Sequence, residues 1–257
     1  MSICTVSIAG ADDNVNPVDL VDISDRYPFV EWGILLSPDK MGSPRFPSLK
    51  WIKRLGEYKE NLRLSGHLCG RWVNDMINGN LSFRAEHHDI WDMLKRIQLN
   101  FHGNFIPLSN NFMDAISLIH GKQIIFQIDD DTNKLFESAV NANLNVAPLF
   151  DSSHGTGTKP EHWPAPCQGV KCGYAGGLSP ENLEEQIQKI LKVSGDRRIW
   201  IDMESGVRTD NKFDIEKVER VLIISEDYIS PESRASSYLE TDKGQEQIHN
   251  SVFPPSV

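Results

Sequence analysis

The segment VKCGYAGGLSPENLEEQIQKILKVSGDRRIWIDMESG, residues 170–206, contains one complete repeat of strand, glycine-rich turn, helix and second strand. Val170–Gly176 and Arg198–Glu204 are short β-type runs that end in glycine or polar residues. Between them, the Ser-Pro-Glu sequence at 179–181 predicts the N-cap and first turn of a helix. The apolar positions of that helix are Leu183, Ile187, Ile190 and Leu191. This order predicts two parallel strands joined by a right-handed crossover.

The same alternation extends over most of the chain. We expect eight strands whose starts lie 22 to 34 residues apart, about the length of one strand, one helix and two short loops. They are Thr5–Gly10, Phe29–Ser37, Arg63–Gly70, Arg96–His102, Gln123–Asp129, Asn145–Asp151, Val170–Gly176 and Arg198–Glu204. Further helix-like stretches occur at residues 47–52, 88–94 and 213–224, and their apolar faces are expected to cover the outside of the sheet.

Eight parallel strands form either an open doubly wound sheet or a closed barrel. The open dinucleotide-binding sheet carries GxGxxG after its first strand, and SIAGADDN at residues 7–14 lacks this motif. We therefore predict an α/β fold, a single (β/α)8 TIM barrel over residues 1–224. Residues 225–257 form a polar C-terminal extension, which is either a clasp over the barrel or a flexible tail.

The composition excludes several classes of protein. The chain has 257 residues, 26 Lys+Arg, 36 Asp+Glu and a formal net charge of −10, so it lacks the positive charge of a nucleic-acid-binding surface. No apolar run approaches the roughly 20 residues that span a bilayer, and the N-terminus lacks a secretory signal. We expect a cytoplasmic monomer or homodimer with no nucleic-acid or membrane partner. Its four cysteines, Cys4, Cys69, Cys167 and Cys172, are expected to be free thiols.

Polar residues gather where the predicted strands end. In a TIM barrel the chemistry lies at the carboxyl ends of the strands, so these residues share one mouth. The residues that end these strands include His67, Cys69, Asn100, His102, Asp129, Asp151 and Asp202. Each of these residues could instead have a purely structural role. A lone histidine often only makes hydrogen bonds, and the run 129–131 is compatible with a solvated turn.

Two glycine-bearing segments follow the last two strands. YAGGLSPEN at 174–182 and MESGVR at 203–208 place small residues where backbone N–H groups can approach an anion. The loops after strands seven and eight are the recurrent phosphate site of such barrels. The predicted phosphate-binding residues are Gly176, Gly177, Leu178, Ser205, Gly206 and Val207, and the expected partner is a small phosphorylated ligand.

The motifs of the C-terminal half resemble those of the phosphoribosylanthranilate isomerase family of ribulose-phosphate-binding barrels. The likeness rests on LFDSSHGTGTKPEHW at 149–163, YAGGLSPENL at 174–183 and IDMESGVRTDNKFDIEKV at 201–218. The N-terminal half resembles the family less closely, through VSIAG at 6–10, GSPRFP at 42–47 and IQLNFHG at 97–103. The resemblance implies an aldose–ketose isomerase that performs an Amadori rearrangement without a cofactor.

The resemblance also implies roles for individual residues. Asp151 matches the general acid of the family, and Asp202 and His102 match further residues of the catalytic site. Arg45 matches the arginine that holds the substrate carboxylate. Gly155, Thr156 and Gly157 match the substrate-binding loop after the sixth strand.

One departure concerns the general base. The family has a cysteine on the first strand, and this chain has Ala9 there. The reaction needs one group that donates a proton and another that accepts one. A substitute base could come from His67 or Cys69, which lie two residues apart on one strand, or from Asp12 or Asp13.

Two other interpretations remain open. The barrel could act on a related phosphorylated ligand, or bind such a ligand without turning it over. Three further departures, at Ser7, Glu204 and Arg208, change the charges around the predicted mouth. A metal site built from His67, His102, Asp129 and Asp151 is an alternative, although no local ligand spacing supports it.

Overall fold

The eight predicted strands close into a parallel barrel in the computed structural model, which describes residues 2–100, 110–128, 132–151 and 160–235. The strands are β1 (Ile3–Ala9), β2 (Val30–Leu36), β3 (Leu64–Leu68), β4 (Arg96–Leu99), β5 (Gln123–Gln127), β6 (Val146–Asp151), β7 (Cys172–Ala175) and β8 (Ile199–Met203). Each strand pairs with its neighbours in chain order, and β1 also pairs with β8, which closes the ring. The predicted TIM-barrel fold is confirmed.

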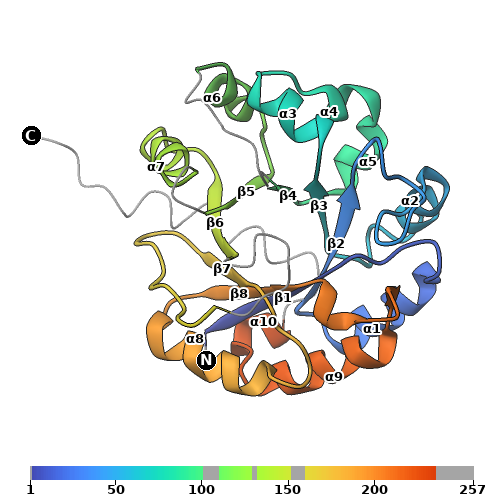
Figure 1. Cartoon of the computed structure of the whole chain (residues 1–257), viewed down its shortest axis with the longest axis vertical. Coiled ribbons are helices and arrows are strands. Elements are labelled where there is room, and N and C mark those ends of the chain that lie inside the picture. Colours follow the sequence, from blue (N-terminus) through green and yellow to red (C-terminus); the bar gives the residue numbers. More distant parts are fainter. Residues whose placement is uncertain (1, 101–109, 129–131, 152–159, 236–257) are drawn as a thin grey trace, which may run out of the picture.

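Helices surround the barrel (Figure 1). They are α1 (Pro17–Arg26), α2 (Leu49–Gly56), α3 (Arg71–Ile77), α4 (Ser82–Glu86), α5 (His88–Met93), α6 (Asn110–Ser117), α7 (Asn133–Asn141), α8 (Leu183–Ser194), α9 (Ile215–Glu226) and α10 (Pro231–Ala235). A short 3-10 helix, η1 (Ser205–Val207), and a two-stranded ribbon, β9 (Arg208–Thr209) with β10 (Lys212–Phe213), follow β8. No helix of the described ranges is long and apolar enough to cross a bilayer.

Helix starts follow local capping chemistry. The Ser48 hydroxyl accepts a hydrogen bond from the Trp51 N–H at the start of α2, and the Asp214 carboxylate accepts one from the Lys217 N–H at the start of α9. The start predicted for α8 is wrong, because that helix begins at Leu183 rather than just after Ser179. The residues between form a turn, since the Asn182 side chain accepts a hydrogen bond from the Ser179 N–H.

The C-terminal segment continues along the barrel beyond the predicted boundary at residue 224, which falls within α9. Ile229 is fully buried and bridges to Ile3 on β1. The Ser230 N–H donates to the Ile3 carbonyl at 2.8 Å, and α10 follows directly. The described part of the extension therefore packs at the start of β1. Residues 236–257 lie outside the described ranges.

The inside of the barrel contains a buried ion pair between β2 and β4. Arg96 donates to Glu31 through Nε at 2.9 Å and through Nη2 at 2.6 Å, and both side chains are buried. The guanidinium also lies 4.5 Å from the ring centroid of Trp200 on β8. Burial is the largest single influence on the pKa of Glu31 and would raise it. The charge and hydrogen bonds of Arg96, with smaller contributions from Arg63 and Lys171, together hold that pKa below its ordinary value. Each charge is therefore stable inside the barrel only while the other is present.

Replacing Arg96 with Met should destabilise the fold by about 3–5 kcal/mol, because it leaves the Glu31 carboxylate buried without a partner. The double variant Glu31→Gln/Arg96→Met should recover a large part of this loss. Urea unfolding of the wild type and of both variants measures the free energies of unfolding. A double variant at least as unstable as Arg96→Met would contradict the assignment.

Candidate active site

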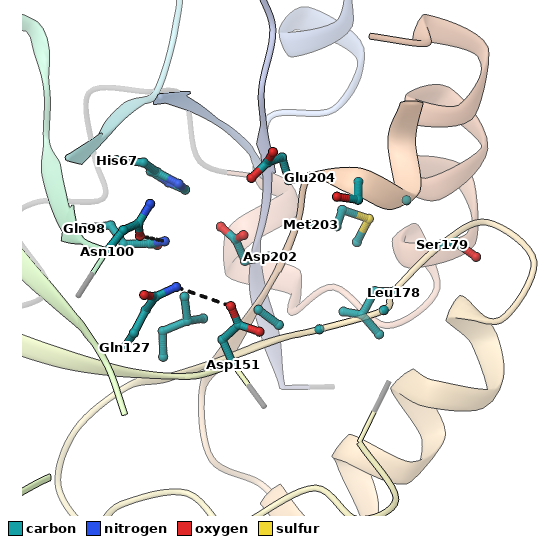
Figure 2. A pocket seen from close by; sticks show the side chains of 16 residues that line it. His67, Gln98, Asn100, Gln127, Asp151, Leu178, Ser179, Asp202, Met203 and Glu204 are labelled. Carbon is teal, nitrogen blue, oxygen red and sulfur yellow. Dashed lines mark hydrogen bonds between the residues drawn. The ribbon is translucent and has the colours of Figure 1, made fainter. Parts of the chain in front are cut away.

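A cavity of about 280 Å³ lies at the carboxyl ends of the strands. Side chains from β3, β4, β5, β6 and β8 converge on it, together with the loops that follow β7 and β8 (Figure 2). The lining residues are His67, Gln98, Asn100, Gln127, Leu149, Asp151, Ala175, Gly176, Gly177, Leu178, Ser179, Asp202, Met203, Glu204, Ser205 and Gly206. Eight of the predicted site residues are among them: His67, Asp151, Gly176, Gly177, Leu178, Asp202, Ser205 and Gly206.

Two carboxyl groups face the cavity from β6 and β8. Asp202 is buried, and its Oδ2 atom makes no hydrogen bond within the described part of the chain. Burial raises the pKa of Asp202 to about 7, with smaller contributions in the same direction from Glu31 and Asp151, while Ser7 and Arg96 oppose the shift. Asp151 accepts a hydrogen bond from Nε2 of Gln127 at 3.3 Å. A substantial share of Asp202 therefore keeps its proton at neutral pH.

His67 lies beside Ala9 of β1. A methyl group added to Gly33 would lie 2.6 Å from Nε2 of His67 and 2.9 Å from Cβ of Ala9, so the glycine makes room for the imidazole ring. Burial lowers the pKa of His67 to about 4, and the Arg96 charge adds to this while Glu31 opposes it. The ring is therefore uncharged at neutral pH, and one of its nitrogens can accept a proton.

Cys69 follows β3 but is not among the residues that line the cavity. It packs against Ala9, Leu35 and Phe46, and Nδ2 of Asn100 lies 3.1 Å from its sulfur. Burial raises the pKa of Cys69 to about 11, which keeps the thiol protonated at neutral pH. A protonated thiol cannot accept a proton, so Cys69 is poorly suited to be the base. All four cysteines of the chain are free, as expected.

The aspartates after β1 have structural partners. The Asp12 carboxylate accepts from the Arg45 N–H at 2.8 Å and forms a buried ion pair with Arg208 at 3.1 Å. Asp13 accepts two hydrogen bonds from Ser48, at 2.7 Å from the N–H and at 2.5 Å from the hydroxyl, and so fixes the start of α2. Neither aspartate lines the cavity.

Arg45 lies at the rim of the mouth with a backbone φ of 76°. Its Nη1 atom is 2.7 Å from Oε1 of Glu204 and 3.1 Å from the hydroxyl of Ser205. Its Nε atom donates to Asn211 at 3.2 Å. The guanidinium predicted to hold a substrate carboxylate is therefore paired with a carboxylate of the chain itself.

The two predicted phosphate loops lie in contact with each other. A Cβ on Gly206 would lie 1.9 Å from the carbonyl oxygen of Leu178, so this approach requires glycine. Asn182 holds the first loop, because its Nδ2 donates to the Gly177 carbonyl at 2.8 Å. Val207, in contrast, is fully buried in the hydrophobic core and does not line the cavity.

Four predicted site residues, His102, Gly155, Thr156 and Gly157, lie outside the described residues, as does Asp129 of the alternative metal site. Across the described ranges, no group of three or more His, Cys, Asp or Glu side chains could hold a metal ion. Gln98 and Gln127 also line the cavity, although neither was predicted from the sequence. The alternation along a strand could have found them, because each lies two residues before a strand-end residue that was considered.

The family model described as N-(5'phosphoribosyl)anthranilate (PRA) isomerase matches residues 87–223, which is just over half of the chain. The chain belongs to this family. The match includes β4 to β8, three of the carboxyl side chains at the mouth and both glycine loops. The predicted membership of the PRA isomerase family is therefore confirmed, and its members are aldose–ketose isomerases.

Individual relatives agree with this assignment. A multifunctional tryptophan biosynthesis protein of Schizosaccharomyces pombe is 31% identical over 119 residues, which are 42% of this chain. The matched region covers only 15% of that protein. The PRA isomerase structures of Thermotoga maritima and Pyrococcus furiosus superpose with TM-scores of 0.53 and 0.50, at 16% and 17% identity. Each match covers 87% of this chain and 98% of the chain in the solved structure. At these identities the likeness shows a shared fold.

The raised pKa of Asp202 predicts a pH-dependent stability. From its ordinary value of 3.8 to about 7, the folded chain holds a proton that the unfolded chain has lost. The stability that the folded chain gains from holding this proton is fully present below pH 3.8 and is lost as pH rises through 7. The loss in the free energy of unfolding is at most about 4 kcal/mol. Asp202→Asn should remove the loss, so the variant should gain stability relative to wild type between pH 5 and pH 8. Parallel stability curves from urea unfolding would contradict the assignment.

Proposed function

We propose that the chain is an aldose–ketose isomerase that acts on an N-(5'-phosphoribosyl) amine. The observation that carries this proposal is that one cavity holds a carboxyl group with a pKa near 7 and an uncharged imidazole. An Amadori rearrangement needs such a pair. An acid protonates the ring oxygen of the ribose and opens it to a protonated Schiff base, and a base then removes the C2 proton to give the enolamine.

Asp151 and Asp202 together are the proposed source of the proton for the ring oxygen. Asp151 matches the general acid of the PRA isomerase family, and its charge contributes to the raised pKa of Asp202. At neutral pH Asp202 therefore retains its proton for part of the time, and this proton can be delivered to the ring oxygen. In this proposal Asp151 faces the ring oxygen, and Asp202 keeps the proton within the cavity.

His67 is the proposed base, in place of the cysteine that the family carries at the position of Ala9. It lines the cavity and lies beside that position, whereas Cys69 and Asp12 do not line it. Cys69 keeps its proton at neutral pH, and Asp12 is held in an ion pair with Arg208. The low pKa of His67 makes it a weak base, so turnover should be slower than with a thiolate.

The glycine loops are the proposed phosphate site. Gly176, Gly177 and Gly206 bring the backbone to the wall of the cavity without a side chain in between. Backbone N–H groups at such a wall favour a dianion. A non-catalytic protein that binds or sequesters a sugar phosphate remains the alternative. A binder returns its ligand chemically unaltered, whereas an isomerase converts an aldose derivative to a ketose derivative.

Replacing Asp151 with Asn should lower kcat by about 10²–10⁴-fold while the affinity for ribose 5-phosphate stays within threefold, because it removes proton transfer and preserves shape. The substrates are the phosphoribosyl amines that ribose 5-phosphate forms with aniline and with anthranilate. Asp196→Asn, at an exposed position between α8 and β8, is the matched control and should retain full activity. Unchanged turnover of Asp151→Asn would remove this residue from the mechanism. Binding without turnover in the wild type would favour the alternative.

Replacing Ala9 with Cys should raise turnover of the same substrates by about 10²-fold, because it puts a thiol beside His67, whose uncharged imidazole can take up the thiol proton and so activate the sulfur as the base. Ala9→Ser has a similar shape but no group of useful basicity, so it should stay at the wild-type rate. Steady-state kinetics of the three proteins makes the comparison. Equal rates for Ala9→Cys and Ala9→Ser would show that position 9 does not face the reacting carbon.

A further inference from the structure

The charged groups around the cavity indicate which kind of amine it accepts. We propose that the chain takes a phosphoribosyl amine whose aglycone carries no carboxylate, with Glu204 as the residue that excludes this group. This inference rests on the proposed function, since it concerns the aglycone of the same substrate.

The described lining of the cavity is rich in acids. It contains the carboxyl groups of Asp151, Asp202 and Glu204, and neither lysine nor arginine is among the described residues that line it. The ring of His67 adds no positive charge at neutral pH. An anionic aglycone would therefore enter a space with negative charge and no described cation inside it, where Coulomb repulsion weakens its binding.

Arg45 lies at the rim of this space, and two nitrogen atoms of its guanidinium are already hydrogen-bonded to other residues of the chain. Nη1 is held by Glu204 and Ser205, and Nε by Asn211. Its backbone is fixed as well, because Asp12 accepts from the Arg45 N–H while paired with the buried Arg208. A substrate carboxylate would have to displace the Glu204 carboxylate from Arg45. Because Glu204 is part of the chain, it pairs with Arg45 without the loss of translational freedom that a free ligand undergoes on binding.

The position of Glu204 is itself constrained. Its Cγ atom lies 3.2 Å from where a Cβ on Gly10 would be, so the stem of the side chain lies against the end of β1. His67, Asp202 and Glu204 point toward the same space in Figure 2. The Glu204 carboxylate therefore occupies the mouth on the side of β1.

Two stable ligands that differ by one carboxylate test the proposal. They are 1-anilino-1-deoxyribitol 5-phosphate and its 2-carboxyanilino counterpart, with ribose 5-phosphate as the reference for the phosphate site. Calorimetry should show that the wild type binds the carboxylated ligand at least tenfold more weakly than the anilino ligand. Glu204→Ser frees Arg45 and should abolish or reverse this ratio, and Glu204→Gln, which keeps the shape, should reduce it.

The control variant is Glu219→Ser, which breaks a surface ion pair between α9 and Arg26 of α1 and should keep the wild-type ratio. Equal or tighter binding of the carboxylated ligand by the wild type would overturn the inference and leave the proposed function standing. An equal change for all three ligands in Glu204→Ser would also overturn it, because Glu204 would then act on the phosphate. If none of the three ligands binds the wild type, the proposed function itself fails.

Discussion

The ion pair between Glu31 and Arg96 is the interaction on which the cavity above it depends. It places two opposite charges inside the barrel, where they offset each other's effect on nearby groups. Loss of solvent is therefore the largest influence on both Asp202 and His67. Burial favours the uncharged form of each, so it raises the pKa of the acid and lowers that of the imidazole. A single physical cause thus produces a proton donor and a proton acceptor in one space.

The departures from the PRA isomerase family form a connected set in the structure. Arg208 pairs with Asp12, Asp12 holds the backbone of Arg45, and the Arg45 side chain pairs with Glu204. Two of these residues, Glu204 and Arg208, are predicted from the sequence to differ from the family pattern. A third predicted departure, Ala9, lies at the end of β1. The chain has the barrel of the family, and an ion pair between Arg45 and Glu204 lies at its rim. Under the proposed function, the scaffold keeps its phosphate site and changes what it does with the rest of the ligand.

The sequence predicts the barrel well because period and turn chemistry are local properties. All eight strands lie where they were expected, although several end earlier, as β4 does at Leu99. The placement of Asp151, Asp202 and the glycines follows from their positions at strand ends. Contacts between residues distant in sequence could not be predicted, such as that of Arg45 with Glu204, because they depend on the path of two loops. The late start of α8 was missed because Asn182 ties the residues before the helix into a turn, accepting from the Ser179 N–H and donating to the Gly177 carbonyl.

We infer that a protonated carboxyl and an uncharged imidazole face one cavity at neutral pH. NMR titration can test this pairing, with ¹³C-labelled aspartate carboxyl groups and the histidine ring protons followed from pH 3 to pH 9. We expect one aspartate with a midpoint near 7, absent in Asp202→Asn, and one histidine that stays uncharged down to about pH 4, absent in His67→Asn. If every aspartate titrated below pH 5, or if His67 titrated near its ordinary value of 6.5, the inferred pairing would be wrong.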